Sequence, residues 1–190
     1  MDLILASQSP RRSELLRNAG FAFQVRARPV EERRAAGELP QEYAMRLAHA
    51  KAEAAWEGKE EVVLGADTIV VLGDRVLEKP DDVADARAML TALSGQYHVV
   101  ITGICLRHPE GSIVDSESTR VHFAVLDQDE IESYASSGEP MDKAGAYAIQ
   151  GLASKFVDRI EGCYFNVMGL PLARAYGHLK RLQCTTGPTS

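Results

Sequence analysis

Residues 62–72 run Val62-Val63-Leu64-Gly65-Ala66-Asp67-Thr68-Ile69-Val70-Val71-Leu72. The first five are apolar or small and are typical of a buried strand, and the apolar run resumes at Ile69. Aspartate is disfavoured inside strands, and a buried charge costs several kcal/mol unless it is paired or bound to a metal. At a strand end beside small residues, Asp67 is therefore a candidate metal ligand or general base, with an Asx-type turn between two strands as the alternative.

Around this stretch, predicted strands alternate with predicted helices. Apolar runs predict strands at 3–6, 21–27, 62–66, 69–72, 76–77, 97–106 and 113–125. Caps, prolines and helical spacing predict helices at 10–19, from 40 onward, and at 80–93, 127–134 and 171–182. This alternation indicates an α/β fold, and the two adjacent long strands predict a mixed sheet instead of a purely parallel one.

The length of 190 residues favours one domain, with 183–190 as a loose polar tail. With 21 Lys and Arg against 27 Asp and Glu, the net charge is −6, which disfavours nucleic acid or an anionic membrane as a partner. No segment approaches the roughly 20 consecutive apolar residues of a membrane span, and the first residues lack the pattern of a signal peptide. Cys105, Cys163 and Cys184 have no CxxC spacing, so neither a disulfide framework nor a zinc site is predicted. We expect a cytoplasmic location.

Charge is distributed unevenly along the chain. Residues 9–34 hold seven arginines against three glutamates, whereas residues 125–142 hold six acidic residues and no Lys or Arg. The acidic stretch fits a solvated face. Two arginines of the basic stretch, however, stand at a predicted helix start.

Several common catalytic motifs are absent from the sequence. It contains no GxxxxGK[ST], no GxGxxG, no HExxH and no GxSxG, so a P-loop and a dinucleotide-binding fold are not supported. The five histidines are scattered without local partners, which favours structural or exposed roles for them.

A possible anion site lies where the first predicted strand meets the first predicted helix. The segment Ser7-Gln8-Ser9-Pro10-Arg11-Arg12 combines two hydroxyls and two guanidiniums with a helix N-terminus. Free backbone N–H groups and the helix dipole favour anions there, and Arg binds phosphate oxygens bidentately. A capped surface helix with exposed arginines is the alternative reading.

A second candidate segment, residues 139–151, contains Lys143, two glycines and Gln150. The glycines allow close backbone approach, the lysine supplies a cation, and the glutamine amide offers both a donor and an acceptor that can match a pyrimidine edge. The alternative is a glycine-rich loop with solvated charges. Lys51 and Lys79 are further candidate cations or plain surface lysines, and Glu31-Glu32 either binds metal or pairs with neighbouring arginines. The residues alone thus favour phosphate chemistry and leave the substrate open.

Together these segments resemble the Maf family of nucleoside triphosphate pyrophosphatases. The resemblance covers roughly residues 3–182 and is carried, in order, by Ala6–Arg12 with Glu14-Leu15-Leu16, Gly65–Thr68, Lys79-Pro80, Ser94-Gly95 with His98, Glu139–Gly151 and Asn166–Pro171. Six motifs at family-like spacing are specific, where one would be weak. The segment Asp142–Tyr147 followed by Ile149-Gln150-Gly151 resembles the dTTP/UTP branch, and only Ala148 stands where glycine is common.

The resemblance implies hydrolysis of dTTP and UTP, and of modified pyrimidine nucleotides, at the α–β phosphoanhydride, which yields a monophosphate and pyrophosphate. It implies a mixed, elongated sheet flanked by helices, with two lobes around a central cleft as in inosine triphosphate pyrophosphatases, in one bilobed catalytic domain over residues 1–182. The implied cofactor is Mg²⁺ or Mn²⁺, and the implied partner is a small-molecule nucleoside triphosphate, with a homodimer left open.

By the same resemblance, Asp67 corresponds to the proton acceptor, and Ser7, Glu31, Lys51 and Lys79 fall at polar positions of the cleft. We expect Glu31 and Asp67 to hold the metal. The substrate-binding residues are expected to be Ser7, Arg11, Arg12, Lys51, Thr68, Lys79, Lys143 and Gln150. Of these, Arg12, Thr68 and Gln150 fall at positions that tune base choice. A non-catalytic nucleotide-binding regulator of cell division and septum formation is the alternative function.

Overall fold

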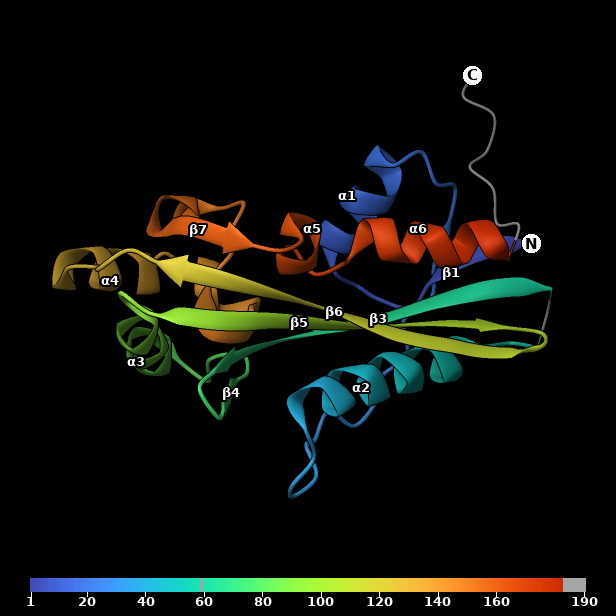
Figure 1. Ribbon diagram of the computed structural model, residues 1–190, viewed down its shortest axis with the longest axis horizontal. Helices are drawn as coiled ribbons and strands as arrows, with labels where there is room; N and C mark the ends of the chain where they lie inside the picture. Colours follow the sequence, from blue (N-terminus) through green and yellow to red (C-terminus); the bar gives the residue numbers. More distant parts are fainter. Residues whose placement is uncertain (59, 183–190) are drawn as a thin grey trace. The chain divides into compact units, whose positions relative to one another are not determined.

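The fold is a seven-stranded mixed sheet with helices, seen in a computed structural model that describes residues 1–58 and 60–182 (Figure 1). The strand order is β2-β1-β3-β5-β6-β7, with β4 paired to β3. The strands are β1 (Asp2–Leu5), β2 (Gln24–Val25), β3 (Glu61–Leu72), β4 (Arg75–Leu77), β5 (Tyr97–His108), β6 (Gly111–Phe123) and β7 (Val157–Glu161). The α-helices are α1 (Pro10–Asn18), α2 (Pro40–Ala55), α3 (Val83–Leu93), α4 (Gln128–Ala135), α5 (Tyr164–Val167) and α6 (Leu172–Arg181).

Both strand directions occur in the sheet. Strand β1 pairs parallel with β2 and with β3, whereas β3 with β4 and β6 with β7 pair antiparallel. The predicted mixed α/β sheet is therefore confirmed. The predicted polar tail, residues 183–190, lies outside the described residues.

Strand β3 corrects the expected break at Asp67-Thr68. It runs without interruption from Glu61 to Leu72, so Asp67 lies within a strand and not in a turn. Valines on both sides of Asp67 favour extended backbone, and an ion pair with Lys51 satisfies the buried carboxylate. Strand β7 was not predicted, because its polar sequence Val157-Asp158-Arg159-Ile160-Glu161 shows no apolar run.

The chain divides into two compact units. Unit 1 contains Met1–Asp67, Thr102–Glu117 and the chain from Gly169 onward, and unit 2 contains Thr68–Ile101 and Ser118–Met168. In unit 1, helix α2 covers one face of the sheet, and α1 and α6 lie on the other (Figure 1). Its core includes the buried residues Ile4, Ala48, Ala52, Val63 and Cys105.

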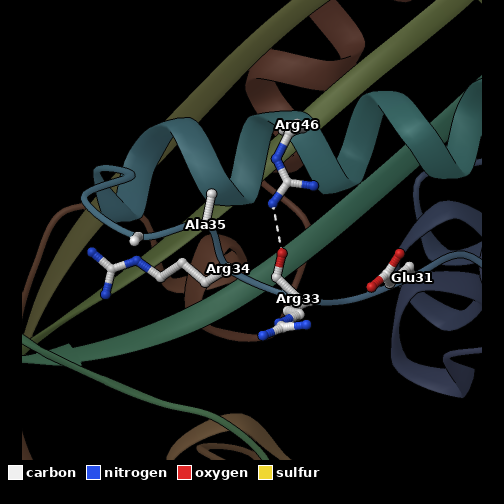
Figure 2. Close-up of a pocket in the computed structure, with 6 residues that line it drawn as sticks. Glu31, Arg33, Arg34, Ala35 and Arg46 are labelled. Atoms are coloured by element: carbon white, nitrogen blue, oxygen red, sulfur yellow. Dashed lines mark hydrogen bonds between the residues drawn. The ribbon is translucent and has the colours of Figure 1, made fainter.

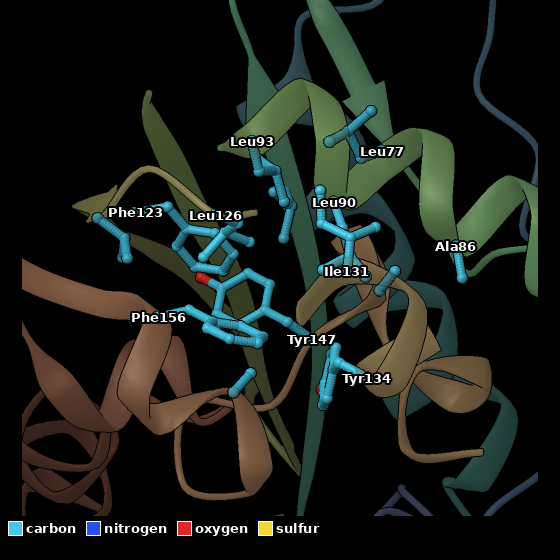
Figure 3. Close-up of a cluster of buried hydrophobic side chains, with 14 of the residues drawn as sticks. Leu77, Ala86, Leu90, Leu93, Phe123, Leu126, Ile131, Tyr134, Tyr147 and Phe156 are labelled. Carbon is cyan, nitrogen blue, oxygen red and sulfur yellow. The ribbon is translucent and has the colours of Figure 1, made fainter. Parts of the chain in front are cut away.

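Unit 2 has a separate apolar core rich in aromatic side chains. Leucines of α3 and Ile131 of α4 contribute to it, and Phe123, Tyr147 and Phe156 form its aromatic part (Figure 3). The rings of Phe123 and Tyr147 meet edge to face with centroids 4.8 Å apart, a favourable arrangement for aromatic pairs. Over the described residues of both units, no helix has the length and apolar character needed to cross a membrane.

Candidate active site

The turn from β1 into α1 is built around the hydroxyl of Ser7. Helix α1 begins at Pro10 as predicted, but Ser9 at its N-cap makes no side-chain cap bond. The Ser7 oxygen instead accepts the backbone N–H of Ser9 at 3.2 Å and a guanidinium N–H of Arg12 at 3.0 Å. Arg12 is held a second time because its Nε donates to the Gly169 carbonyl at 2.7 Å. The serine and the arginine predicted to face an anion are therefore ordered together.

Parallel pairing brings the end of β1 beside the part of β3 that leads to Asp67. Leu5 is paired with Leu64, and the Ala6 N–H donates to the Leu64 carbonyl at 2.9 Å. Ser7 follows two residues after Leu5, and Asp67 follows three residues after Leu64. The register therefore places Ser7, just past the end of β1, near the stretch of β3 that carries Asp67, while β3 itself continues to Leu72.

Helix α2 reaches Asp67 because Gly65 lets it approach the sheet closely. A Cβ at Gly65 would lie 2.2 Å from the Ala48 carbonyl oxygen, so only glycine fits. Gly65 and Asp67 share one face of the strand, and Ala48 and Lys51 share one face of the helix. The close approach at the first pair therefore aligns Lys51 with Asp67.

Three charged side chains meet at this point. The Lys51 ammonium lies 2.6 Å from Asp67 Oδ1 and 2.6 Å from Glu32 Oε1. Asp67 is buried, and Lys51 keeps 15% of its side chain exposed. The expected metal ligand was Glu31, but the carboxylate that the structure places at Lys51 is that of Glu32; two adjacent glutamates carry no local signal that tells which one turns inward.

The cluster changes the proton affinity of its members. Burial raises the pKa of Asp67, and the neighbouring charges of Lys51 and Arg12 only partly offset this effect. Burial also lowers the pKa of Arg12, with Asp67 and Glu32 opposing the shift and Arg11 adding to it. Desolvation outweighs pairing at Asp67, and a carboxylate in such surroundings is a better proton acceptor than an exposed one.

Glu31 lies in different surroundings from Glu32. It lines a pocket of about 440 Å³ together with Arg33, Arg34, Ala35, Ala36 and Arg46 (Figure 2). Arg46 holds this loop in place: its guanidinium donates to the Glu38 carboxylate at 2.6 and 2.9 Å and to the Arg33 carbonyl at 2.9 Å. The hydrogen bond from Arg46 lowers the pKa of Glu38 to about 2. The structure therefore places Glu32 at Lys51 and Glu31 beside a basic pocket.

The remaining predicted residues belong to unit 2. Thr68 is partly buried, whereas Lys79 and Gln150 are exposed. The Lys143 ammonium donates to the Glu139 carbonyl at 2.7 Å and pairs with Asp142. The Gly145 N–H donates to the Glu78 carbonyl at 3.0 Å, so the segments carrying Lys79 and Lys143 are adjacent within unit 2.

The acidic residues of the cluster suit a divalent cation shared with a substrate. Within the described part of the chain, no three His, Cys, Asp or Glu side chains are grouped to enclose a metal ion. Asp67 and Glu32 nevertheless supply two carboxylates, and Mg²⁺ is commonly bound by one or two carboxylates plus substrate phosphates. Carboxylate oxygens are the ligands that such an ion takes, so the donor groups of this cluster fit it.

The fold and this cluster define an α/β protein that holds a buried carboxylate among cations suited to a phosphate-bearing ligand. The model of the Maf-like protein family matches residues 2–182, and the chain belongs to that family.

Curated relatives match over almost the whole chain. A protein of Koribacter versatilis named dTTP/UTP pyrophosphatase is 55% identical, with 95% of this chain and 94% of that protein covered. A protein of the same name from Vibrio cholerae is 53% identical, with 90% of this chain and 92% of that protein covered. Another from Aquifex aeolicus is 44% identical, with both chains covered completely.

Solved structures share the fold at low sequence identity. The HAM1 protein of Coxiella burnetii superimposes with a TM-score of 0.51 at 16% identity, covering 95% of this chain and 99% of that one. The Ham1 protein of Staphylococcus aureus gives a TM-score of 0.50 at 15% identity, covering 94% of this chain and 100% of that one. These likenesses support the expected fold similarity to inosine triphosphate pyrophosphatases and concern the fold alone.

Proposed function

We propose that the protein hydrolyses dTTP and UTP at the α–β phosphoanhydride and releases the nucleoside monophosphate and pyrophosphate. The observation that carries this proposal is the buried Asp67 carboxylate, 2.6 Å from the Lys51 ammonium and under the electrostatic influence of Arg12. The names of the curated relatives supply the substrates, dTTP and UTP.

In this mechanism Asp67 accepts the proton of the water that attacks the α-phosphorus in line. Its raised pKa makes it a stronger base than an ordinary aspartate. Ser7 and Arg12, already hydrogen-bonded to each other, bind phosphate oxygens, and Arg11 and Lys51 add positive charge. Mg²⁺ or Mn²⁺, when held by Asp67 with Glu32 or Glu31, offsets charge on the phosphate oxygens.

The proposal gives the unit 2 residues two kinds of role. Lys79 and Lys143 supply cations for the phosphates, whereas Thr68 and Gln150 act in base selection. The Gln150 side chain is exposed, so its amide is available to a base. A cytoplasmic location and a homodimer stay predictions.

The deciding experiment incubates the full-length chain with dTTP, UTP, CTP, ATP and GTP, with Mg²⁺ or Mn²⁺, in ¹⁸O-labelled water. We expect pyrophosphate from dTTP and UTP, with the label in the monophosphate because water attacks the α-phosphorus. Release of orthophosphate in place of pyrophosphate would show that a bond other than the α–β phosphoanhydride is cleaved. Nucleotide binding without product release would favour the non-catalytic regulator.

Asp67→Asn tests the role of the base. Turnover should fall by about 10²–10⁴-fold, the usual contribution of general-base catalysis, in a protein that stays folded. Asp129→Asn, at an exposed position of α4, is the matched control and should retain full activity.

A further inference from the structure

The carboxylate of Glu139 holds one end of the loop that carries Gln150. The backbone N–H of Leu152 donates to both Glu139 oxygens, at 3.0 and 3.2 Å. The Tyr134 hydroxyl donates to the same carboxylate at 2.8 Å. A carboxylate that accepts both an amide and a hydroxyl forms charge-assisted bonds, which are stronger than neutral ones.

The hydroxyl of Tyr134 holds the other end of that loop. It accepts the backbone N–H of Ala148 at 3.2 Å while it donates to Glu139. Ala148 and Leu152 are the residues two before and two after Gln150. One connected pair of side chains therefore fixes the backbone on both sides of the glutamine.

Close packing at Gly151 tightens the same arrangement. A Cβ at this residue would lie 2.4 and 2.5 Å from the two Glu139 carboxylate oxygens. The backbone next to Gln150 thus rests directly on Glu139, with no space for a side chain between them.

Packing and helix capping hold Tyr134 in place. Tyr134 is 4% exposed, and its ring packs edge to face on Phe156 with centroids 5.4 Å apart. Helix α4, which carries Tyr134, begins with a complete capping box between Asp127 and Glu130. Both features restrict movement of the hydroxyl that contacts the loop.

We infer that Glu139 and Tyr134 are positioning residues for base selection, because together they set the direction in which the Gln150 amide is presented. This inference rests on the proposed function, in which Gln150 reads the base. An amide discriminates between bases only if its donor and acceptor stand at defined places. A loop freed at Ala148 or Leu152 therefore loses selectivity before it loses the capacity to hydrolyse.

The test compares kcat/KM for dTTP with kcat/KM for GTP in Glu139→Gln, Tyr134→Phe and Gln150→Ala. Glu139→Gln and Tyr134→Phe are the clamp variants, and each should lower the dTTP-to-GTP ratio about tenfold, as expected when a charge-assisted hydrogen bond is lost. Combining Glu139→Gln with Gln150→Ala should lower the ratio no further than Gln150→Ala alone. Glu161→Gln removes an exposed carboxylate that pairs with Arg120 and should leave the ratio unchanged.

Amide hydrogen exchange gives a readout that does not depend on activity. Exchange at Ala148 and Leu152 should accelerate in both clamp variants, while the melting temperature stays near that of the wild type. Equal losses of kcat/KM for dTTP and GTP with a lowered melting temperature would show a merely structural role and overturn the inference.

The outcomes separate this inference from the proposed function. If the wild type releases no pyrophosphate from dTTP or UTP, the proposed function is wrong, and this inference with it. If Gln150→Ala lowers the ratio but the clamp variants do not, the inference alone is wrong.

Discussion

Lys51 Nζ lies 2.6 Å from Asp67 Oδ1, and the same ammonium lies 2.6 Å from a carboxylate oxygen of Glu32. The Lys51 ammonium therefore pairs with two carboxylates, of which that of Asp67 is buried. The relation is asymmetric, because loss of the lysine leaves two carboxylates together, whereas loss of Asp67 leaves the lysine one partner. This asymmetry can be measured.

Lys51→Met should destabilise the protein more than Asp67→Asn does. Removing one partner of a buried pair typically costs about 3–5 kcal/mol. Lys51 lowers the pKa of Asp67, so without it the carboxyl takes up a proton more easily, which lessens that cost. We expect a loss of roughly 2–3 kcal/mol for Lys51→Met at pH 7. In urea unfolding, the double variant should be more stable than the sum of the single effects predicts, by about 0.5–3 kcal/mol. Strict additivity would show that the two groups do not interact.

Gly65→Ala should disrupt both packing and activity. The added methyl would meet the Ala48 carbonyl at 2.2 Å and the Ala52 nitrogen at 2.8 Å, and neither backbone atom can rotate away. Overpacking of this kind costs about 1–3 kcal/mol or more, and it pushes Lys51 away from Asp67. The melting temperature and the rate of pyrophosphate release should therefore both fall.

Gly177→Ala is the matched control for this change. Gly177 lies inside α6 with no atom within 4 Å of its added Cβ. Replacement by alanine in a helix should stabilise the protein by up to about 1 kcal/mol. If Gly65→Ala left stability unchanged or increased it, as expected for this control, α2 would not approach β3 as closely as described.

Short-range signals in the sequence predicted most of the elements correctly. Pro10 begins α1, the Asp82 side chain caps α3 by accepting the Asp85 N–H, and Asp127 with Glu130 forms the capping box of α4. Each of these interactions joins residues within one turn. Local physical chemistry is therefore sufficient to locate them.

Contacts between distant residues were not predictable in the same way. Strand β7 exists because the edge of β6 offers it hydrogen-bonding partners, and its own polar sequence does not indicate this. The inward position of Glu32 depends on where α2 places Lys51, which in turn depends on Gly65. A glycine within an apolar strand does suggest close backbone approach, but it does not identify the helix that approaches.

Acid should destabilise the protein through His98. This histidine is 1% exposed, its Nε2 lies 2.8 Å from the Tyr147 hydroxyl, and burial lowers its pKa from 6.5 to about 4. The unfolded chain binds this proton more readily than the folded protein does. The stabilisation from neutral His98 is therefore fully present above pH 6.5 and is lost as the pH falls towards 4. Between pH 7 and pH 5 the loss from this residue should be about 2 kcal/mol.

His98→Gln serves to isolate that contribution. The glutamine keeps a hydrogen-bonding group near Tyr147 and does not titrate, so urea unfolding should show a smaller loss between pH 7 and pH 5 than in the wild type. An equal loss in both proteins would assign the acid sensitivity to other groups. His108→Gln, at a partly buried position near the end of β5, should retain the wild-type loss.

Glu32 and Glu31 provide the sharpest test of metal binding. Glu32 shares Lys51 with Asp67, whereas Glu31 lines the pocket with Arg33, Arg34 and Arg46. A carboxylate close to Asp67 can share a cation with it. One that lines a pocket with three arginines is a weaker ligand, because their positive charges repel the metal. Glu32→Gln should therefore raise the Mn²⁺ concentration needed for half-maximal pyrophosphate release at least about tenfold. Mn²⁺ binding followed by electron paramagnetic resonance in the presence of dTTP should weaken in parallel, and excess chelator should abolish turnover. Glu31→Gln is the matched control, with a much smaller shift expected; a larger shift there would return the ligand role to Glu31 and leave Glu32 as a partner of Lys51 only.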